Sequence, residues 1–373
     1  MNRTILKKIM LPLFLFFCIG PKPCVAQVSA NTPVKLCVAR LTHDHVGWIL
    51  SRKKTDVVIA GIYEPDKALA EHYSKKYGFS MSLVYDDLDK MLNEIKPEAV
   101  AAFGSILEHA QVVELCAPKH IHVMVEKPLA TTYEQALHMD SLAKEFNIQL
   151  LTNFETSWYA TTAKAYQLAN DSNYFGSIKK VVVHDGHQGP KEIGVSNNFF
   201  EWLTDSIKNG GGALIDFGCY GANLMTYLMK GEQPISVTAV TKKFKPAIYP
   251  NVDDDATIIL NYPSATCIIQ ASWNWPFGRK DMEVYGQTGY VITINNNNMR
   301  MRTQPDTAEH FVTLSPEALH VYTDPFTYLA DVLRKKITVP ENGLYALKTN
   351  VTVVRILSAA RLSAKTGKTI YLQ

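Results

Sequence analysis

The stretch His122-Val-Met-Val-Glu126-Lys127-Pro128-Leu-Ala130 predicts a buried strand that ends at a charged pair. Pro128 has no N–H group and a fixed φ, so it ends the strand and favours an extended conformation for Lys127. A lysine held at the carboxyl end of a strand, at the crevice of a parallel sheet, is placed to meet a ligand. Taken alone, the motif fits a lysine in a solvated turn equally well, and the rest of the chain has to decide.

The first half of the chain alternates strand-like and helix-like segments on both sides of this stretch. Short apolar runs are bounded by turn residues, and amphipathic segments lie between them. The predicted strands are 34–39, 56–63, 99–103, 121–125 and 149–152, and the predicted helices are 45–50, 67–77, 86–94, 109–117 and 133–146. This alternation predicts an α/β Rossmann-like dinucleotide-binding domain over residues 33–153, with a parallel sheet and helices on both faces.

A sheet of this kind binds dinucleotides at its first strand–helix turn. Glu64 lies about 20 residues beyond that turn, where an acid binds the ribose, although a surface glutamate in a loop fits this position too. The turn, Val38 to Gly47, lacks the G-x-G-x-x-G glycines that let the backbone approach a pyrophosphate. Its polar side chains could donate to phosphate or could fill the cofactor's space, and the sequence leaves both open. The candidate cofactor-binding residues are Arg40, Thr42, His43, His45, Glu64 and Glu126.

The second half of the chain has a different pattern. A predicted helix at 159–169 is followed by alternating runs at 178–187, 235–244, 256–262, 266–274, 282–285 and 290–295. These runs predict an α+β substrate domain over residues 154–343 with a large, mostly antiparallel open sheet. Helices are predicted over 326–336 and 344–364, and we expect residues 344–373 to form a C-terminal helix and tail that pack back on the body.

Residues 209–223, Asn-Gly-Gly-Gly-Ala-Leu-Ile-Asp-Phe-Gly-Cys-Tyr-Gly-Ala-Asn, place three glycines before a helix. Asp216, Tyr220 and Asn223 recur at i, i+4 and i+7, so they are expected to share one helix face. A carboxylate, a phenol and an amide on one face form a polar stripe that suits substrate binding. A helix at a domain interface, whose polar groups pair with one another, is the structural alternative.

These two stretches together resemble the Gfo/Idh/MocA oxidoreductase family, named for glucose–fructose oxidoreductase and inositol dehydrogenase. The resemblance rests on Glu126-Lys127-Pro128 and on the glycine run followed by Asp216-x-Gly218-x-Tyr220, and it spans nearly the whole chain. It is closest to the glucose–fructose oxidoreductase branch, which has Tyr where many members have His. The resemblance implies a Rossmann domain, a C-terminal open-sheet domain, bound NAD(P), and hydride transfer on sugars, sugar derivatives or polyols.

The resemblance also implies roles for three catalytic residues. Lys127 would bind the reacting hydroxyl or carbonyl and ease loss of its proton, and Asp216 would orient the substrate or Lys127. Tyr220 would be the general acid/base, with its phenol pKa lowered from about 10 by the nearby ammonium. The candidate substrate-binding residues are Lys127, His184, His187, Asp216, Tyr220 and Asn223.

Two histidines, His184 and His187, end the first strand of the second half. They lack a nearby acidic or cysteine third ligand, so we expect contact with substrate hydroxyls or a structural pairing and no metal site. Arg279 and Lys280 are interpreted as turn charges.

The first 26 residues are typical of a cleavable signal peptide. Arg3, Lys7 and Lys8 precede a short apolar run, and Cys24-Val25-Ala26 offers a small-x-small cleavage site. We therefore expect export, to the periplasm, with no membrane span once the leader is removed. The leader holds four of the 38 basic residues and no acidic residue, so 34 basic and 35 acidic residues remain. A chain with this nearly neutral balance is not expected to bind nucleic acid.

The leading functional hypothesis is an exported NAD(P)-dependent oxidoreductase acting on a carbohydrate, as a homo-oligomer. NAD is favoured over NADP, and the cofactor is expected to be tightly bound because no free pool is expected outside the cell. One alternative is an NAD-dependent glycoside hydrolase that oxidises, eliminates, adds water and reduces. Another is a non-catalytic sugar-binding protein with a decayed nucleotide site. The missing glycines favour this last alternative, whereas Lys127, Asp216 and Tyr220 count against it.

Overall fold

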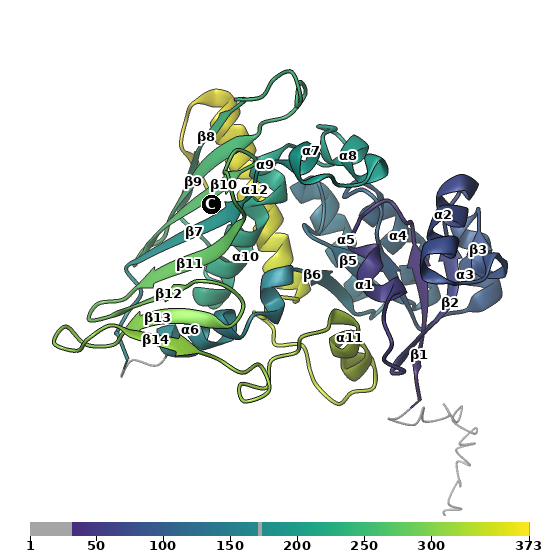
Figure 1. The fold of residues 1–373 in the computed structure, drawn as a ribbon, viewed down its shortest axis with the longest axis horizontal. Helices are drawn as coiled ribbons and strands as arrows, with labels where there is room; N and C mark the ends of the chain where they lie inside the picture. The colour runs from purple at the N-terminus through teal and green to yellow at the C-terminus, as the bar shows by residue number, and fades with distance from the viewer. Residues whose placement is uncertain (1–31, 171–173, 373) are drawn as a thin grey trace, which may run out of the picture.

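The computed structural model describes residues 32–170 and 174–372, and the predicted signal peptide lies outside these residues. Two sheets lie side by side, each with its own helices (Figure 1). The first sheet has six parallel strands in the order β3-β2-β1-β4-β5-β6. Its strands are β1 (Val34–Ala39), β2 (Val57–Tyr63), β3 (Val84–Tyr85), β4 (Ala99–Ala102), β5 (His122–Glu126) and β6 (Leu150–Asn153).

Helices cover both faces of this sheet, as the alternating pattern predicts. Alternate residues of β1 enter different cores: Leu36 and Val38 pack with α1, whereas Cys37 packs with α3 and α4. The helices are α1 (Val46–Leu50), α2 (Lys67–Tyr77), α3 (Leu88–Ile95), α4 (Glu108–Cys116) and α5 (Tyr133–Glu145). Most of these bounds lie within two residues of the sequence prediction. Helix α2 begins at an Asp66 cap and ends at Gly78, whose φ is 78°.

The second sheet has nine strands in the order β14-β13-β12-β11-β7-β10-β9-β8-β15 and is mostly antiparallel, with β7 and β10 parallel. Its strands are β7 (Lys180–Gly186), β8 (Ser236–Lys242), β9 (Asp255–Asn261), β10 (Thr266–Ser272), β11 (Arg279–Tyr285), β12 (Tyr290–Thr293), β13 (Asn298–Arg302), β14 (His310–Thr313) and β15 (Ile370–Tyr371). In β9, Ala256, Ile258 and Leu260 are buried while Ile259 is exposed, so one face packs on helices and the other is open.

Helices between the two sheets join the halves of the molecule (Figure 1). They are α6 (Ala160–Asn170), α9 (Ala213–Asp216), α10 (Gly218–Leu228) and α12 (Leu347–Thr366), while α7 (Pro190–Ile193), α8 (Asn197–Leu203) and α11 (Pro325–Leu333) lie in connections. Helix α12 packs on α5 of the first domain and on α10 and β8 of the second. Strand β15 then adds to the edge of the large sheet beside β8.

The structure adds elements that periodicity missed. Strands β3 and β15 have two residues each, and β13 and β14 carry exposed polar residues that hide their alternation. The predicted helix through Asp216 and Tyr220 is broken at Phe217 into α9 and α10. Cys37, Cys116, Cys219 and Cys267 are buried free thiols. Among the described residues, none of the helices combines the length and apolar character needed to cross a bilayer.

Candidate active site

Lys127 lies where β5 ends and α9 of the second domain begins to pack against it. Its ammonium donates a hydrogen bond to the Asp216 carboxylate and another, of 3.1 Å, to the Asp216 carbonyl oxygen. The Lys127 side chain is only 7% exposed. The strand-end position therefore delivers this lysine to a buried ion pair and not to a solvated turn.

Asp216 is held on its other side by the indole of Trp273, whose Nε1 donates to Asp216 Oδ2 at 3.0 Å. Burial alone would raise the pKa of Asp216, but the Lys127 ammonium keeps it below its usual value. Burial would likewise lower the pKa of Lys127, and Asp216 reverses that effect and raises it. The pair is therefore fixed as ammonium and carboxylate. Trp273, which is fully buried, therefore also orients Asp216.

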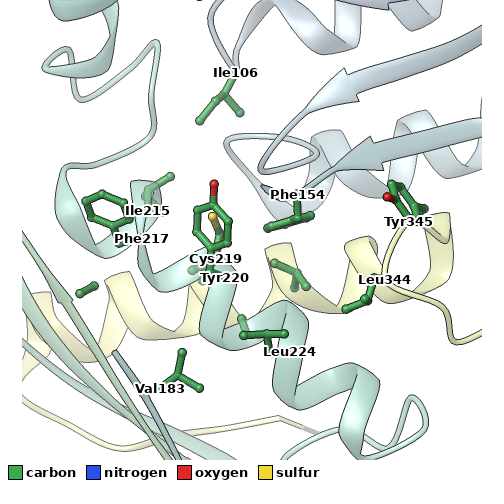
Figure 2. Packing of buried hydrophobic residues seen from close by; sticks show 14 of the residues in the cluster. Ile106, Phe154, Val183, Ile215, Phe217, Cys219, Tyr220, Leu224, Leu344 and Tyr345 are labelled. Carbon is green, nitrogen blue, oxygen red and sulfur yellow. The ribbon is translucent and has the colours of Figure 1, made fainter. Parts of the chain in front are cut away.

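The ring of Tyr220 stands between Phe154 and Phe217, with its hydroxyl pointing away from α10 toward the loop of Ile106 (Figure 2). Two ammonium groups lie near this ring: Lys127 Nζ is 5.2 Å and Lys280 Nζ 4.6 Å from its centroid. Within the described part of the chain, the hydroxyl makes no hydrogen bond.

The pKa of Tyr220 departs from expectation. We expected Lys127 to lower it, but burial raises it well above 10, and the nearby Glu155 and Asp185 add to that effect. Loss of water costs the phenolate more free energy than the two ammonium groups return. Tyr220 is therefore a neutral phenol and a hydrogen-bond donor.

Sequence reasoning missed three charged residues that complete this region. Lys280, interpreted as a turn charge, forms an ion pair of 2.5 Å with Glu155, and Glu155 also accepts from the Tyr159 hydroxyl at 2.7 Å. Asp185 is 1% exposed at the end of β7. The position of Glu155 was detectable, because it follows β6 as Lys127 follows the neighbouring β5. Lys280 and Asp185 depend on the strand register of the second sheet, which the sequence does not give.

A cavity of about 720 Å³ opens beside these residues. Its lining includes Glu155, Tyr159, Asp185, His187, Phe217 and Lys280. His187 accepts a hydrogen bond from the Gly189 N–H at 2.9 Å through Nδ1, and burial lowers its pKa, so its Nε2 carries the proton of a neutral ring. This geometry brings His187 to the cavity as a hydrogen-bond donor.

The structure does not bring Asn223 and His184 to this cavity. Asn223 is fully buried, and its amide donates to the Leu344 carbonyl at 3.0 Å and to Asn350, so the expected polar stripe splits between site and interior. The ring of His184 faces Asp281 at 3.2 Å and borders a separate small cavity. Asn223 thus has the structural role of a polar residue paired at a helix interface, because its side of α10 faces α12.

In the turn between β1 and α1, an arginine occupies the acid that was expected to bind a ribose. Arg40, at φ 70°, occupies a conformation that glycine adopts easily, and its guanidinium binds Glu64 at 2.6 Å and Glu108 at 3.0 Å. Gly104 makes room for it, since a Cβ there would lie 3.1 Å from Arg40 Cγ. Glu64 also accepts from the Leu41 and Asp66 N–H groups. The acid expected to bind a ribose is therefore already occupied.

The opposite end of the crevice is built from His43, His45 and Glu126. His45 Nδ1 lies 3.0 Å from Glu126, and Glu126 also accepts from Asn153 at 2.7 Å. His43 Nδ1 accepts from the His45 N–H at 3.1 Å, and burial lowers the pKa of His43 well below its usual value. Its proton therefore sits on Nε2, which is buried and has no partner among the described residues. Thr42 donates to the Phe103 carbonyl at 3.4 Å, and its own carbonyl accepts from Trp202.

His43, His45 and Glu126 are also close enough together to hold a metal ion, with possible ligand atoms within 4.8 Å of one another. They are the one such group of His, Cys, Asp or Glu residues in the described ranges. A metal would need a lone pair on His43 Nε2, where the observed hydrogen bond places a proton. The donor chemistry of His43 suits an acceptor group of a ligand better than a cation.

Comparisons with known proteins place this fold in a class. Residues 39–154 match the model of an oxidoreductase family with an NAD-binding Rossmann fold, and residues 149–292 match the GFO/IDH/MocA C-terminal domain. The chain belongs to the Gfo/Idh/MocA oxidoreductase family. Aldose-aldose oxidoreductase from Caulobacter crescentus, solved with glycerol, has the same fold, with a TM-score of 0.76 over 91% of this chain and all of that one at 20% identity.

Two curated relatives are dehydrogenases. Trans-1,2-dihydrobenzene-1,2-diol dehydrogenase of Xenopus tropicalis is 23% identical over 61% of this chain and 64% of its own length. D-glucoside 3-dehydrogenase of Escherichia coli is 25% identical over 57% of this chain and 58% of its own. The matches thus span less than two thirds of either relative.

The residues at the crevice fit the family's dinucleotide at one end only. His43 Nε2 is a buried donor without a partner in the described structure, and Glu126 lies beside Lys127, so this end suits the nicotinamide half. At the other end Arg40 binds Glu64, the acid that the sequence predicts to bind a ribose.

Proposed function

We propose that this protein is an NAD-dependent oxidoreductase that interconverts a hydroxyl and a carbonyl on a sugar, sugar derivative or polyol. The observation that carries the proposal is the buried Lys127–Asp216 ion pair beside the Tyr220 phenol, at the junction of the two domains. Membership of the family and the activities named for the two dehydrogenase relatives support the substrate class.

The side chains define what the site does to the reacting oxygen. Lys127, fixed as an ammonium by Asp216, stabilises negative charge on that oxygen, and Tyr220 donates a hydrogen bond to it. Phe154 and Phe217 beside Tyr220 exclude water, which strengthens both interactions. His43 and Glu126 hold the nicotinamide end of the dinucleotide, which, when bound, accepts or returns the hydride.

The cavity provides the contacts for the rest of the substrate. Glu155, His187 and Lys280 offer acceptors and donors in its lining, and Phe217 offers an apolar surface. This alternation of polar groups with an aromatic face suits a polyhydroxylated ligand.

The direct test is turnover. The purified protein is mixed with NAD and a panel of aldoses, glucosides, inositols and diols, and NADH absorbance is followed. We expect reduction of NAD with at least one of them, and none with the Lys127→Met variant. No turnover in either direction across the panel, with dinucleotide bound, would reject the proposal.

We further propose NAD rather than NADP as the cofactor. Arg40 stands between two carboxylates, Glu64 and Glu108, so the ribose end keeps a net negative charge that disfavours a 2′-phosphate. Titration with each dinucleotide tests this, and tighter binding of NADP would contradict it.

Export with a tightly held cofactor remains part of the proposal. Residues 1–26, which are typical of a signal peptide, support export. Because no free NAD is expected outside the cell, an exported enzyme needs a cofactor that it holds tightly. Cell fractionation tests the first point, and release of a dinucleotide from purified, denatured protein tests the second. Protein found in the cytoplasm with an intact N-terminus would contradict export.

We also propose a homo-oligomer joined through the open face of the large sheet. Val240, Ile259 and Ile294 are 59%, 40% and 43% exposed on its strands and the adjoining turn. Exposed apolar residues gathered on one face favour association. Sedimentation analysis should give a mass above that of one chain, and Val240→Lys should lower it.

A further inference from the structure

Asp185 is a buried carboxyl group without a partner. It is 1% exposed, and neither carboxylate oxygen makes a hydrogen bond within the described structure. Burying a carboxyl in this way costs free energy, and buried polar groups are nearly always paired unless they serve a ligand. The burial of this unpaired carboxyl group is therefore better explained by a function than by the needs of folding.

The strand register places Asp185 opposite a cation that is engaged elsewhere. Lys280 of β11 is the direct cross-strand partner of Asp185 on β7, so both side chains leave the same face of the sheet. The Lys280 ammonium bonds Glu155 at 2.5 Å and makes no hydrogen bond to Asp185. The charged and titratable groups that face Asp185 from the packed elements are Lys127, Glu155, Tyr159, His184, Asp216, Cys219, Tyr220, Lys280 and Asp281.

Asp185 borders the 720 Å³ cavity, and it differs there from every other carboxyl of the lining. Glu155 accepts from Lys280, Asp281 from Arg279, and Glu283 from the Tyr285 hydroxyl. Asp185 also borders a second, small cavity of about 10 Å³, which is near the lower limit for holding one water molecule.

The other groups near the reacting oxygen have fixed protonation states. Lys127 is held as an ammonium by Asp216, and Tyr220 is held as a phenol by burial. His187 already accepts a hydrogen bond at Nδ1 and carries its proton on Nε2. Burial raises the pKa of Asp185 well above its usual value, while Lys280 and Lys127 oppose that rise, so this carboxyl binds a proton more readily than an exposed aspartate does.

We propose that Asp185 takes up the proton released when the substrate hydroxyl is oxidised, and returns it in the reverse reaction. This inference rests on the proposed function. In oxidation the C–H bond breaks and its electron pair leaves as hydride to the nicotinamide dinucleotide. The O–H bond breaks as well, the C=O bond forms, and the proton ends on a carboxylate oxygen of Asp185. Lys127 and Tyr220 stabilise the oxygen while this happens.

The experiment compares Asp185→Asn with the wild-type protein. The amide keeps the shape but cannot exchange a proton, so kcat should fall by about 10²–10⁴-fold, and the limb of the kcat–pH profile that Asp185 sets should disappear. In Asp185→Ala, which leaves room for a small carboxylate, added formate should restore part of the rate. Because the variant also removes an unpartnered carboxyl, its melting temperature at pH 8 should be at or above that of the wild type. An unchanged kcat and pH profile would overturn the proposal.

Asp255→Asn is the matched control, because burial also raises the pKa of Asp255, but this carboxylate accepts a hydrogen bond from the Ser272 hydroxyl and lies outside the lining of the cavity. It should leave the kcat–pH profile unchanged. Infrared difference spectra of wild type against Asp185→Asn give a readout without turnover: a carboxylic-acid band that titrates supports the proposal. If that band is absent at every pH, the proposal fails. If the band titrates but no polyol is oxidised, the proposed function fails while Asp185 remains a proton-exchanging group.

Discussion

The Lys127 ammonium and the Asp216 carboxylate form a buried ion pair that joins the end of β5 to the end of α9, across 89 residues of sequence. Each is about 7% exposed or less, and each fixes the charge of the other. A buried pair of this kind is a poor source of stability, because desolvation cancels most of the attraction. Its retention between two domains is better explained by the reactive site that it forms.

Replacement of Lys127 tests both the role of the ion pair in catalysis and its effect on stability. Lys127→Met should abolish turnover, and it should also destabilise the protein by about 3–5 kcal/mol, because Asp216 is left buried without its cation. Adding Asp216→Asn to the variant should recover most of the stability, measured by urea unfolding, but none of the activity. Turnover within about tenfold of wild type would remove Lys127 from the mechanism.

Tyr220→Phe separates chemistry from packing. The hydroxyl makes no hydrogen bond in the described structure, so the melting temperature should hardly change, while loss of this donor to the reacting oxygen should lower kcat by about 10²–10³-fold with little change in substrate affinity. Tyr227→Phe, on the same helix but stacked on Tyr166, is the control and should keep full activity. An early-melting Tyr220→Phe that turns over normally would make the phenol a structural group.

Arg40→Gly should open the ribose end of the crevice. The change frees Glu64 and puts glycine at φ 70°, where it carries no Cβ penalty. We expect NAD to bind at least tenfold more tightly by calorimetry, about 1.4 kcal/mol. Lys96→Gly, at an exposed residue with φ 48°, controls for the gain in stability from glycine in a left-handed position and should leave NAD affinity unchanged. Equal affinity in Arg40→Gly and wild type would show that Arg40 does not compete with the ribose.

His109 should make stability depend on pH. Burial lowers its pKa to about 4, whereas an unfolded histidine titrates near 6.5. Between these values the unfolded chain binds a proton that the folded protein does not, so stability falls as the pH drops, by up to about 1.4 kcal/mol per pH unit. His109→Gln should reduce this slope in urea unfolding between pH 7 and 5, leaving the part that His43 and His187 supply, and the exposed His138→Gln should leave the slope unchanged. A slope equal to that of the wild type in His109→Gln would assign the effect to other groups.

The sequence by itself specified the layered organisation. Hydrophobic period and turn residues set the strands and helices of the first domain because these signals are local, and Gly78 and Asp66 mark helix ends through their own backbone and side-chain chemistry. Two motifs, at Lys127 and at Asp216–Tyr220, indicated the site before any contact was known. The place of Lys127 at the edge of the parallel sheet followed from its position at a strand end, whereas its contact with Asp216 depends on how α9 packs against that edge.

Only the tertiary structure decided which residues form the site and which protonation states they have. Glu155, Asp185 and Lys280 meet through the register of β7 with β11 and through the approach of β6, and long-range register is not encoded in a local pattern. Asn223 left the site because α10 turns that side chain toward α12. The phenol of Tyr220 stays neutral and Arg40 covers Glu64 because burial and pairing depend on neighbours that folding brings together from distant segments.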